Sequence, residues 1–401
     1  MRILVMHRVP DSFVRYAENL DHTAHQVTYV STPERLATLP AGVPARRIER
    51  PGTGDTAAEV LAAVSGLPRP DLVVALSEYD LLPAAQVREA LDVPGPRVAD
   101  VLPTRDKVVM KAAVAAAGLR VPRYAPLDRA LASGVDWTGR SVLKPLAGAS
   151  SEGITTYPTP DAALTAVRDG SVRVDVDGFE IEEFVEGPIL HIDGAVAAGR
   201  PLAVQASRYL GTCLGYAEGA PLGSVQTDTP PATVDFTLAC LRAVGITDGP
   251  FHLEAIETAD GPVFLEVGAR VGGADVADTF ELATGVHLAS AQLRLLAGET
   301  LDGPAAPAAG PDARYGWFVV PGHTLGSAYC RIEGEKPFRE NPVVRRWVQR
   351  APHEPVKAAI TYADADIPLA GVVGPAPTAV LERFLTELFA SVTVEPGEDP
   401  R

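Results

Sequence analysis

The stretch SVLKPLAGASSEGI, residues 141–154, joins a strand-like run to a lysine and then to a loop of small residues. Such a loop beside a lysine is typical of phosphate binding. In a P-loop, however, the lysine follows the glycines and opens a helix. Here Lys144 comes before the loop, at the end of the predicted strand. The sequence therefore predicts a phosphate site of a different kind.

The composition narrows the class of protein. The chain has 401 residues, of which 46% are hydrophobic and 21% charged, which is typical of two or three globular domains. A net charge of −16 argues against nucleic-acid binding, which needs a basic face, but permits a small anionic substrate. Cys213, Cys240 and Cys330 form no CxxC motif, so neither a disulfide framework nor a zinc site is expected.

Targeting signals are not evident in the sequence. The N-terminal run MRILVMHRVP has too short an apolar core for a signal peptide, and no apolar stretch approaches the ~18 residues of a membrane span. We therefore expect a cytoplasmic protein that binds neither membrane nor nucleic acid. The segment DGPAAPAAGPD, residues 302–312, is predicted to be a linker or an exposed loop.

Strands and helices alternate over residues 1–100, which predicts a parallel α/β layer. The strands are expected at 2–6, 25–30 and 72–76, and the helices at 55–65 and 82–91. Ligands bind beyond the carboxyl ends of such strands, so Glu78 is a candidate substrate residue. Capping of the next helix by Ser77 or Asp80 explains this segment equally well.

The later part of the chain mixes hairpins and helices, which predicts an α+β arrangement. Strands are expected within 141–156, 179–185, 190–210, 251–257 and 262–267, and helices at 105–118, 161–168, 235–244, 278–284, 287–297 and 378–391.

A pair of glutamates lies in FHLEAIETADGPVFLEVGARVGG, residues 251–273. Glu254 and Glu266 fall on two strands joined by a turn, where cross-strand neighbours lie about 4.5–5.5 Å apart. Carboxylates that close repel unless a cation lies between them, and Mg²⁺ prefers such oxygen ligands. Solvent-facing glutamates are the alternative, but both residues interrupt apolar runs. Arg270 follows and could stabilise charge on a transferred phosphoryl group.

The segment EIEEFVEGPILHIDG, residues 180–194, places acidic residues at a strand end. Residues 182–185 could offer adenine a backbone carbonyl, an N–H and a carboxylate, although a charged edge strand that prevents aggregation explains them equally well. His191 could contact substrate or phosphate. His252 is expected to be structural and to face the opposite side of its strand from Glu254.

Together these segments resemble the ATP-grasp superfamily over about residues 100–300. The motifs, in order, are Asp106-Lys107, AGLRVP (117–122), VLKP (142–145), EEFVEG (182–187), HLE (252–254) and FLEVGARVGG (264–273). The resemblance implies an ATP-grasp fold, of α/β and α+β class, with ATP held between two antiparallel sheets. The domains implied are an N-terminal parallel α/β pre-ATP-grasp domain at 1–100, a small subdomain with the linking helix and phosphate loop at 101–187, and a large subdomain with the C-terminal region at 188–401.

The resemblance also implies roles for individual residues. Glu254 and Glu266 would hold one or two Mg²⁺ ions, and Arg270 and Lys144 would be catalytic. The ATP-binding set is Lys107, Lys144, Gly148, Ser150, Ser151, Gly153, Glu182, Glu183, Phe184, Val185, Glu186 and His191. Substrate candidates are Glu78, Arg208, His323 and Arg331, with ordinary ion pairs or a surface hairpin as the alternative.

Two positions depart from the family's pattern. Many relatives bind ribose through a glutamate where this chain has Ile189, which leaves Glu186 as a substitute. Many also have an asparagine as a further Mg²⁺ ligand where this chain has Gly268. The departures concern ribose binding and the number of Mg²⁺ ions.

The phrases LVVALSEYDLLPAA (72–85) and GPILHIDG (187–194) look most like the amino-acid ligase branch. This predicts an ATP-dependent carboxylate–amine ligase that forms a dipeptide-like amide through an acyl phosphate and releases ADP and phosphate. Natural-product biosynthesis, amino-acid substrates and a homodimer are further expectations by analogy. The alternatives are a biotin- or formate-type ATP-grasp carboxylase and a non-catalytic nucleotide-binding regulatory protein.

Overall fold

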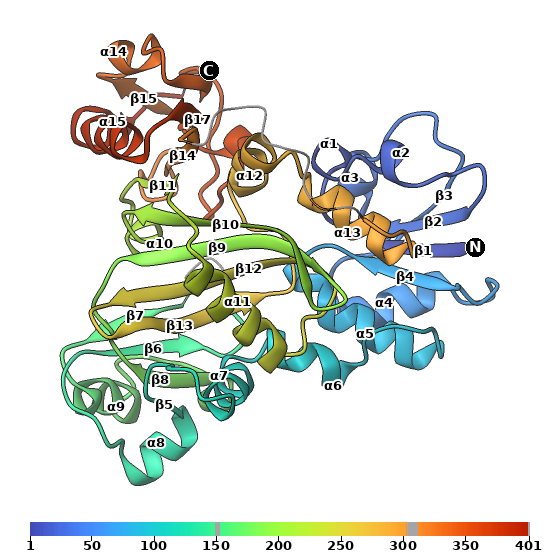
Figure 1. The fold of residues 1–401 in the computed structure, drawn as a ribbon, viewed down its shortest axis with the longest axis horizontal. Helices are drawn as coiled ribbons and strands as arrows, with labels where there is room; N and C mark the ends of the chain where they lie inside the picture. Colours follow the sequence, from blue (N-terminus) through green and yellow to red (C-terminus); the bar gives the residue numbers. More distant parts are fainter. Residues whose placement is uncertain (149–152, 302, 304–311, 400–401) are drawn as a thin grey trace.

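The computed structural model describes residues 1–148, 153–301, 303 and 312–399. Four sheets organise this part of the chain (Figure 1). The first is parallel and formed by the N-terminal residues. Two antiparallel sheets of four and eight strands lie next along the chain, and a two-stranded ribbon lies near the C-terminus.

The N-terminal sheet has the order β3-β2-β1-β4, and all its strands are parallel. Its strands are β1 (Arg2–Met6), β2 (Gln26–Ser31), β3 (Arg46–Glu49) and β4 (Leu72–Ala75). Successive side chains of β1 alternate between the two faces. Leu4 and Met6 pack with residues of the helices α4 (Thr56–Ala63) and α5 (Leu81–Ala90).

The other face of this sheet is covered partly by a helix that lies far along the chain. Ile3 and Val5 share a cluster with Leu293 of α13 (Leu288–Leu296) and with residues of three short helices. These helices are α1 (Asp11–Val14), α2 (Tyr16–Asn19) and α3 (Pro33–Leu36). A helix predicted within the large subdomain therefore completes the N-terminal core.

The small antiparallel sheet has the order β5-β8-β6-β7. Its strands are β5 (Tyr124–Pro126), β6 (Ser141–Pro145), β7 (Thr155–Tyr157) and β8 (Phe179–Glu183). Leu143 and Ile181 pack with residues of α8 (Leu127–Ser133) and α9 (Pro160–Arg168). Both strands predicted within 141–156 are thus present, since β6 ends at Pro145 and β7 begins at Thr155.

The large sheet has the order β13-β12-β9-β10-β11-β14-β17-β16 and is antiparallel throughout. Its strands are β9 (Ile189–Ala197), β10 (Arg200–Leu210), β11 (Leu222–Gln226), β12 (Gly249–Thr258), β13 (Gly261–Gly268), β14 (Arg314–Val320), β16 (Val344–Gln349) and β17 (Leu369–Ala376).

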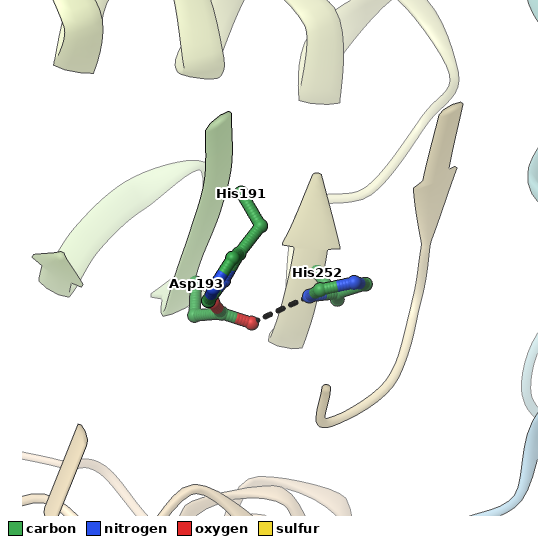
Figure 2. Close-up of side chains that lie close together, drawn as sticks. All are labelled: His191, Asp193 and His252. Atoms are coloured by element: carbon green, nitrogen blue, oxygen red, sulfur yellow. Dashed lines mark hydrogen bonds and ion pairs between the residues drawn. The ribbon is translucent and has the colours of Figure 1, made fainter. Parts of the chain in front are cut away.

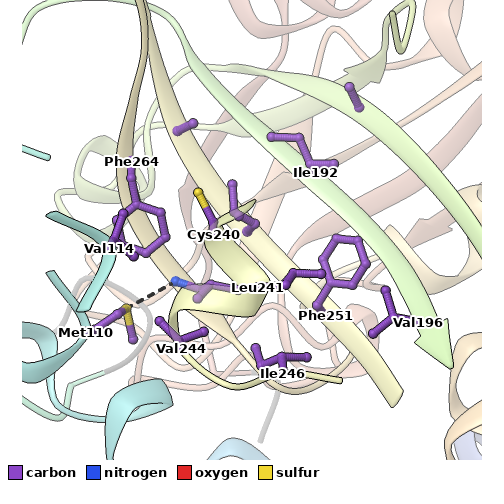
Figure 3. Packing of buried hydrophobic residues seen from close by; sticks show 14 residues of the cluster. Met110, Val114, Ile192, Val196, Cys240, Leu241, Val244, Ile246, Phe251 and Phe264 are labelled. Atoms are coloured by element: carbon purple, nitrogen blue, oxygen red, sulfur yellow. Dashed lines mark hydrogen bonds between the residues drawn. The ribbon is translucent and has the colours of Figure 1, made fainter. Parts of the chain in front are cut away.

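Two helices cover the β9–β12–β13 part of this sheet, as Figure 3 shows. They are α7 (Lys107–Ala116), which places Met110 and Val114 in the core, and α11 (Pro231–Ala243), which contributes Leu241. The Val267 N–H lies 3.4 Å from the sulfur of Met110. The helix α7 ends before Gly118, whose φ of 79° suits a glycine at a helix C-terminus. Lys107 is the first residue of this helix, and it lines the site described below.

The remaining elements complete the periphery. They are α6 (Val98–Val101), α10 (Cys213–Ala217), α12 (Val276–Thr284), β15 (Cys330–Glu333), α14 (Lys336–Arg339), α15 (Thr378–Ser391) and β18 (Thr393–Pro396), with 3₁₀ turns η1 (Glu78–Asp80), η2 (Leu102–Thr104), η3 (Val176–Gly178) and η4 (Asp364–Asp366). The strands β15 and β18 pair as a separate ribbon. Among the described residues, no helix is both long and apolar enough to cross a membrane.

The predicted fold class is confirmed, and most predicted elements lie within one or two residues of their observed bounds. The strand β3, with sequence RRIE, was missed. Three of its four residues are charged and exposed, so an edge strand of this kind carries no apolar signal. The predicted division into domains at residues 100 and 187 stays a prediction.

Candidate active site

A cavity of about 370 Å³ is lined by residues of both antiparallel sheets. The small sheet contributes Val142, Lys144, Glu182 and Glu183, and the large sheet contributes Ile189, Glu254, Ile256, Leu265 and Glu266. Much of the remaining wall is formed by Lys107, Arg140, Pro145, Gly148, Phe184, Val185, Cys213 and Leu214. The cavity is therefore partly apolar, with charged groups of both signs.

Glu254 and Glu266 occupy directly opposite positions of the β12–β13 hairpin. This confirms that the two glutamates are cross-strand neighbours. Each has its own cationic or hydrogen-bonding partner. Lys107 Nζ lies 3.2 Å from Glu266 Oε2, and the Tyr209 hydroxyl donates to Glu254 Oε1 at 2.9 Å. Burial would raise the pKa of Glu266, but Lys107 and Lys144 outweigh it and lower the pKa to about 2.

Two lysines and two glutamates form a buried group beside the cavity. Lys111 Nζ lies 2.6 Å from Glu180 Oε1 and 2.6 Å from Glu182 Oε2. Lys144 Nζ lies 2.7 Å from Glu182 Oε1 and 3.9 Å from Glu180 Oε1. All four side chains are at most 4% exposed, so their charges are compensated mainly by one another.

The electrostatics of this lysine–glutamate group keep Lys144 charged. Burial would lower the pKa of Lys144, but Glu182 and Glu180 outweigh it and raise the pKa to about 12. Burial would raise the pKa of Glu182, yet Lys111 and Lys144 hold it below its usual value. Burial dominates at Glu180 and raises its pKa, and the Oε2 atom of Glu180 has no hydrogen-bond partner among the described residues. Lys144 therefore stays positively charged where it lines the cavity.

The strand end proposed for adenine borders the cavity. Glu183, Phe184 and Val185 all line it, but the side chain of Glu183 is already paired with Arg123 at 2.7 Å. The Arg140 guanidinium lies 3.7 Å from the centre of the Phe184 ring. This is cation–π geometry, and it holds the ring against a second wall residue.

Arg270 is not among the residues that line the cavity, and it contacts the N-terminal layer. Its Nε donates to Glu78, which also accepts from Arg105. Burial would raise the pKa of Glu78, but Arg270 and Arg105 lower it. A Cβ added at Gly268 would lie 2.8 Å from Glu78 Oε2. The glycine found where many relatives have asparagine therefore leaves room for the Glu78 carboxylate.

A buried cluster of His191, Asp193 and His252 lies on the same face of the large sheet as Glu254 (Figure 2). His252 Nε2 is 3.5 Å from Glu254 Oε1, so the expectation that His252 faces the other side is wrong. Residues i and i+2 of a strand share a face, which explains the result. Burial would lower the pKa of His252, but Asp193 and Glu254 outweigh it and raise the pKa to about 9.

His191 does not line the cavity. It is 2% exposed, and its ring nitrogens face Asp193 and Ser224 at 2.5 and 2.6 Å. Both hydrogen-bonding positions of the ring are therefore occupied by protein groups, which argues against direct contact with ATP.

All four substrate candidates, Glu78 included, and the proposed ribose residue also lie outside the cavity lining. Arg208 is paired with Glu257 and Glu382, and the His323 ring contacts the carbonyl of Ala217. Arg331 belongs to the β15–β18 ribbon, where it is 60% exposed and paired with Glu333 and Glu395. Glu186 is 82% exposed and lies 3.8 Å from Arg140. Ordinary ion pairs, the alternative noted for Arg208, describe most of these positions.

The phosphate loop is only partly described. Gly148 lines the cavity, and its carbonyl accepts from Lys107 Nζ at 3.1 Å. Gly153 has a φ of 74°, which suits glycine in a turn. Ser150 and Ser151 lie outside the described residues, so their predicted role is not placed.

The motifs missed several residues that support the site. Lys111 follows Lys107 by one helical turn of α7, and this i, i+4 spacing could have identified Lys111 as a second lysine on the same helix face. The alternation His191-x-Asp193 against His252-x-Glu254 would have located Asp193. Arg105 and Tyr209 had no such signal, because their contacts join segments far apart in the chain.

A second cavity, of about 630 Å³, lies at the amino ends of the parallel strands. Arg2, Arg46 and Arg69 contribute to it, but it contains no lysine and no carboxylate. It is larger than the first cavity. Its lining includes His22 and His25, but among the described residues it has no pair of carboxylates for Mg²⁺ and no group of three potential metal ligands. The cavity between the antiparallel sheets is therefore the candidate active site.

No protein-family model matches the chain. An L-arginine-specific L-amino acid ligase of Bacillus subtilis is 23% identical over 242 residues, which is 56% of this chain and 57% of that protein. An uncharacterized protein of Sinorhizobium fredii is 28% identical over 219 residues, 52% of this chain and 45% of its own length. A dapdiamide A synthase of Enterobacter agglomerans is 49% identical over 41 residues, 10% of each chain. The chain thus spans about half the length, or less, of the curated relatives it matches.

Solved structures match along the whole chain. The L-amino acid ligase from Bacillus licheniformis gives a TM-score of 0.71 at 20% identity and covers 99% of this chain and 98% of its own. The biotin carboxylase domain of Hydrogenobacter thermophilus 2-oxoglutarate carboxylase, solved with MgADP, gives 0.58 at 15% identity and covers 99% and 91%. At these identities the likeness establishes the fold. The chain has the ATP-grasp fold that its motifs predicted, and L-amino acid ligases are among the proteins to which its sequence and its structure are similar.

Magnesium, which accompanies the nucleotide in one of these structures, suits the donor set of the cavity. Glu254 and Glu266 present carboxylates from directly opposite positions, and neither is more than 34% exposed. Carboxylate oxygens are the ligands Mg²⁺ prefers, and one or two are sufficient when phosphates complete its shell.

Proposed function

We propose that the chain is an ATP-dependent carboxylate–amine ligase that joins two small substrates of the amino-acid class through an amide bond. The observation that most supports this proposal is that Glu254 and Glu266 lie opposite each other in a cavity that Lys107 and Lys144 also line. The names of two relatives, an L-amino acid ligase and a dapdiamide synthase, support amide formation and a role in natural-product biosynthesis.

In the proposed reaction, a substrate carboxylate oxygen attacks the γ-phosphorus of ATP and the bond to ADP breaks. The amine then attacks the acyl carbon, phosphate leaves and the amine loses a proton. The protein's contribution is positioning and charge stabilisation. Magnesium, when held by Glu254 and Glu266, supplies positive charge next to the phosphates.

The chain's own cations have separate tasks in this proposal. Lys107 and Lys144 bind phosphate oxygens, and Lys144 is suited to this because it stays charged. Arg270 stabilises negative charge on the transferred group, while Glu78 fixes the guanidinium from the N-terminal layer. Glu78 itself is buried and paired with Arg270 and Arg105, so its task in this proposal is to position Arg270. The nucleotide base lies against Phe184 and Val185.

The test is ADP and phosphate release from Mg·ATP with pairs of amino acids and other small carboxylates, with products identified by mass spectrometry. Release that needs both a carboxylate and an amine, with a product mass equal to their sum less water, is the expected result. Release with bicarbonate or formate alone would replace the proposal by a carboxylase or formyl-phosphate route. Tight ATP binding without release would favour the regulatory alternative.

Two variants of the same hairpin test the site itself. Glu266→Gln removes a proposed metal ligand and the carboxylate partner of Lys107, so it should abolish turnover and lower the melting temperature while the protein stays folded at the assay temperature. Glu257→Gln changes a half-exposed glutamate of β12 that pairs with Arg208, outside the cavity lining, and should retain activity. Full activity in Glu266→Gln would contradict the assignment.

A further inference from the structure

Glu254 is held by a network of buried side chains that the proposed chemistry does not use. Two neighbouring strands supply its core. His191 and Asp193 of β9 lie opposite Glu254 and His252 of β12, so all four side chains share one face. Tyr209 of β10 reaches the same carboxylate. The network therefore surrounds one of the two proposed metal ligands.

Asp193 is the centre of this network. Its Oδ1 accepts from His252 Nδ1 at 2.7 Å, and its Oδ2 accepts from His191 Nδ1 at 2.5 Å. His191 Nε2 lies within hydrogen-bond distance of the Ser224 hydroxyl, at 2.6 Å. Because both oxygens of Asp193 accept, each ring is fixed in orientation and carries a proton on Nδ1.

This orientation directs the other nitrogen of His252 at Glu254. His252 Nε2 lies 3.5 Å from Glu254 Oε1, and the Tyr209 hydroxyl donates to the same oxygen at 2.9 Å. Among the described residues, Glu254 Oε2 has no hydrogen bond or ion pair of its own. One carboxylate oxygen is thus held by the protein, and the other is available to the cavity that Glu254 lines.

The surroundings keep this arrangement rigid. Asp193 and His191 are each 2% exposed. The backbone at Gly272 closes over them, since a Cβ there would lie 2.8 Å from Asp193 Oδ1 and 2.9 Å from His252 Nδ1. Gly272 of the ARVGG segment therefore allows the backbone to pack closely against Asp193 and His252.

We propose that Asp193, His252 and Tyr209 are positioning residues that hold Glu254 Oε1 and thereby present Oε2 to the magnesium ion of the active site. This inference rests on the proposed function. Partners that orient a metal ligand typically change metal affinity about 10–100-fold when removed. The network should therefore determine how much Mg²⁺ the protein needs, more than how fast it turns over when Mg²⁺ is saturating.

The three residues His191, Asp193 and His252 also have the spacing of a metal site. Their facing atoms are, however, already paired with one another at 2.5 and 2.7 Å. Hydrogen bonds account for this geometry without an ion. A metal held by the cluster itself is therefore the competing outcome of the test.

The experiment compares Tyr209→Phe and Asp193→Asn with the wild-type protein. Tyr209→Phe removes one hydroxyl donor and keeps the ring. The matched control is Tyr216→Phe, which removes a buried hydroxyl that donates to the Thr361 carbonyl and does not contact Glu254. Two quantities are measured: the Mg²⁺ concentration for half-maximal ATP turnover, and the binding of Mn²⁺ to the protein with ADP, by electron paramagnetic resonance.

In both variants we expect the Mg²⁺ concentration for half-maximal turnover to rise at least about tenfold and Mn²⁺ to bind more weakly. The kcat should be largely recovered at saturating Mg²⁺, and Tyr216→Phe should behave like the wild-type protein. Unchanged Mg²⁺ and Mn²⁺ dependence in Tyr209→Phe would overturn the inference even if Asp193→Asn fails to fold. Stoichiometric zinc in the wild-type protein that Asp193→Asn lacks would overturn it by making the cluster a metal site. A wild-type protein that needs no divalent cation and binds no Mn²⁺ would instead refute the proposed function.

Discussion

The lysine–glutamate group of Lys111, Lys144, Glu180 and Glu182 allows a quantitative test of the electrostatics beside the cavity. Lys111→Met keeps the length of an unbranched side chain but removes one of two cations. Lys144 alone would then face both carboxylates in a site where each side chain is at most 4% exposed. The lost contacts include a cation–π contact of 4.6 Å to the Tyr124 ring.

The expected loss of stability is large. Removing one partner of a buried ion pair typically destabilises by about 3–5 kcal/mol, because the other charge is left uncompensated. One kcal/mol shifts the melting temperature of a domain of 150–250 residues by about 2–4 °C, so the transition should fall by at least about 6 °C. Thermal unfolding followed by calorimetry measures this shift.

Two further variants make this reasoning refutable. Lys357→Met removes an ion pair in which the lysine is 62% exposed, and it should cost less than about 1 kcal/mol. Lys111→Met with Glu180→Gln restores the charge balance, because Lys144 and Glu182 then remain as a pair, and should recover part of the loss. A melting temperature of Lys111→Met equal to that of Lys357→Met would refute the argument, as would a double variant less stable than the single one.

Three other predictions concern separate features. Arg270→Lys keeps the charge but loses the guanidinium that contacts Glu78, and ADP release should fall about 10²-fold; a wild-type rate would remove Arg270 from the machinery. Gly187→Ala should lower stability by about 1–3 kcal/mol in thermal unfolding, since φ is 155° and the new Cβ would lie 2.2 Å from the Glu257 carbonyl oxygen; Gly199→Ala, with open space around it, is the control and should lose less. Arg50 and the backbone N–H groups of residues 52–54 lower the pKa of Glu59 to about 2, below its ordinary 4.5, so its contribution to stability is present above about pH 4.5 and lost as the pH falls towards 2. Glu59→Gln should flatten the dependence of melting temperature on pH in that window, and an unchanged slope would contradict this.

Local sequence was sufficient for the parts of the site that lie on one hairpin or one strand end. The opposed positions of Glu254 and Glu266 followed from two apolar runs and a turn, because a short hairpin leaves little choice of partner. Lys144 was located at the end of β6 by the same local pattern, and it lines the cavity.

Contacts between distant segments could not be predicted in this way. Arg208, His323 and Arg331 were suggested by residue type, but each has a partner elsewhere that only the packed sheets provide. His191 is next to the cavity along the chain, yet its strand directs the ring towards Asp193. A residue type reports what a side chain can do, whereas its surroundings decide what it does.

By itself, the sequence determined the alternation of strands and helices in the N-terminal layer and the residues of the β12–β13 hairpin, since hydrophobic periodicity and turn residues act over a few positions. The ATP-grasp fold was predicted from the resemblance of the motifs to that superfamily, and the strands β11, β14, β16 and β17 of the large sheet were not predicted. Only the tertiary structure decided that Lys111 and Glu180 complete a buried charge group, that Glu78 reaches Arg270 from another layer, and that Asp193 orients His252 towards Glu254. These contacts span tens to almost two hundred residues along the chain. They exist because burial forces each charged group to find a partner, and packing of the sheets decides which partner is within reach.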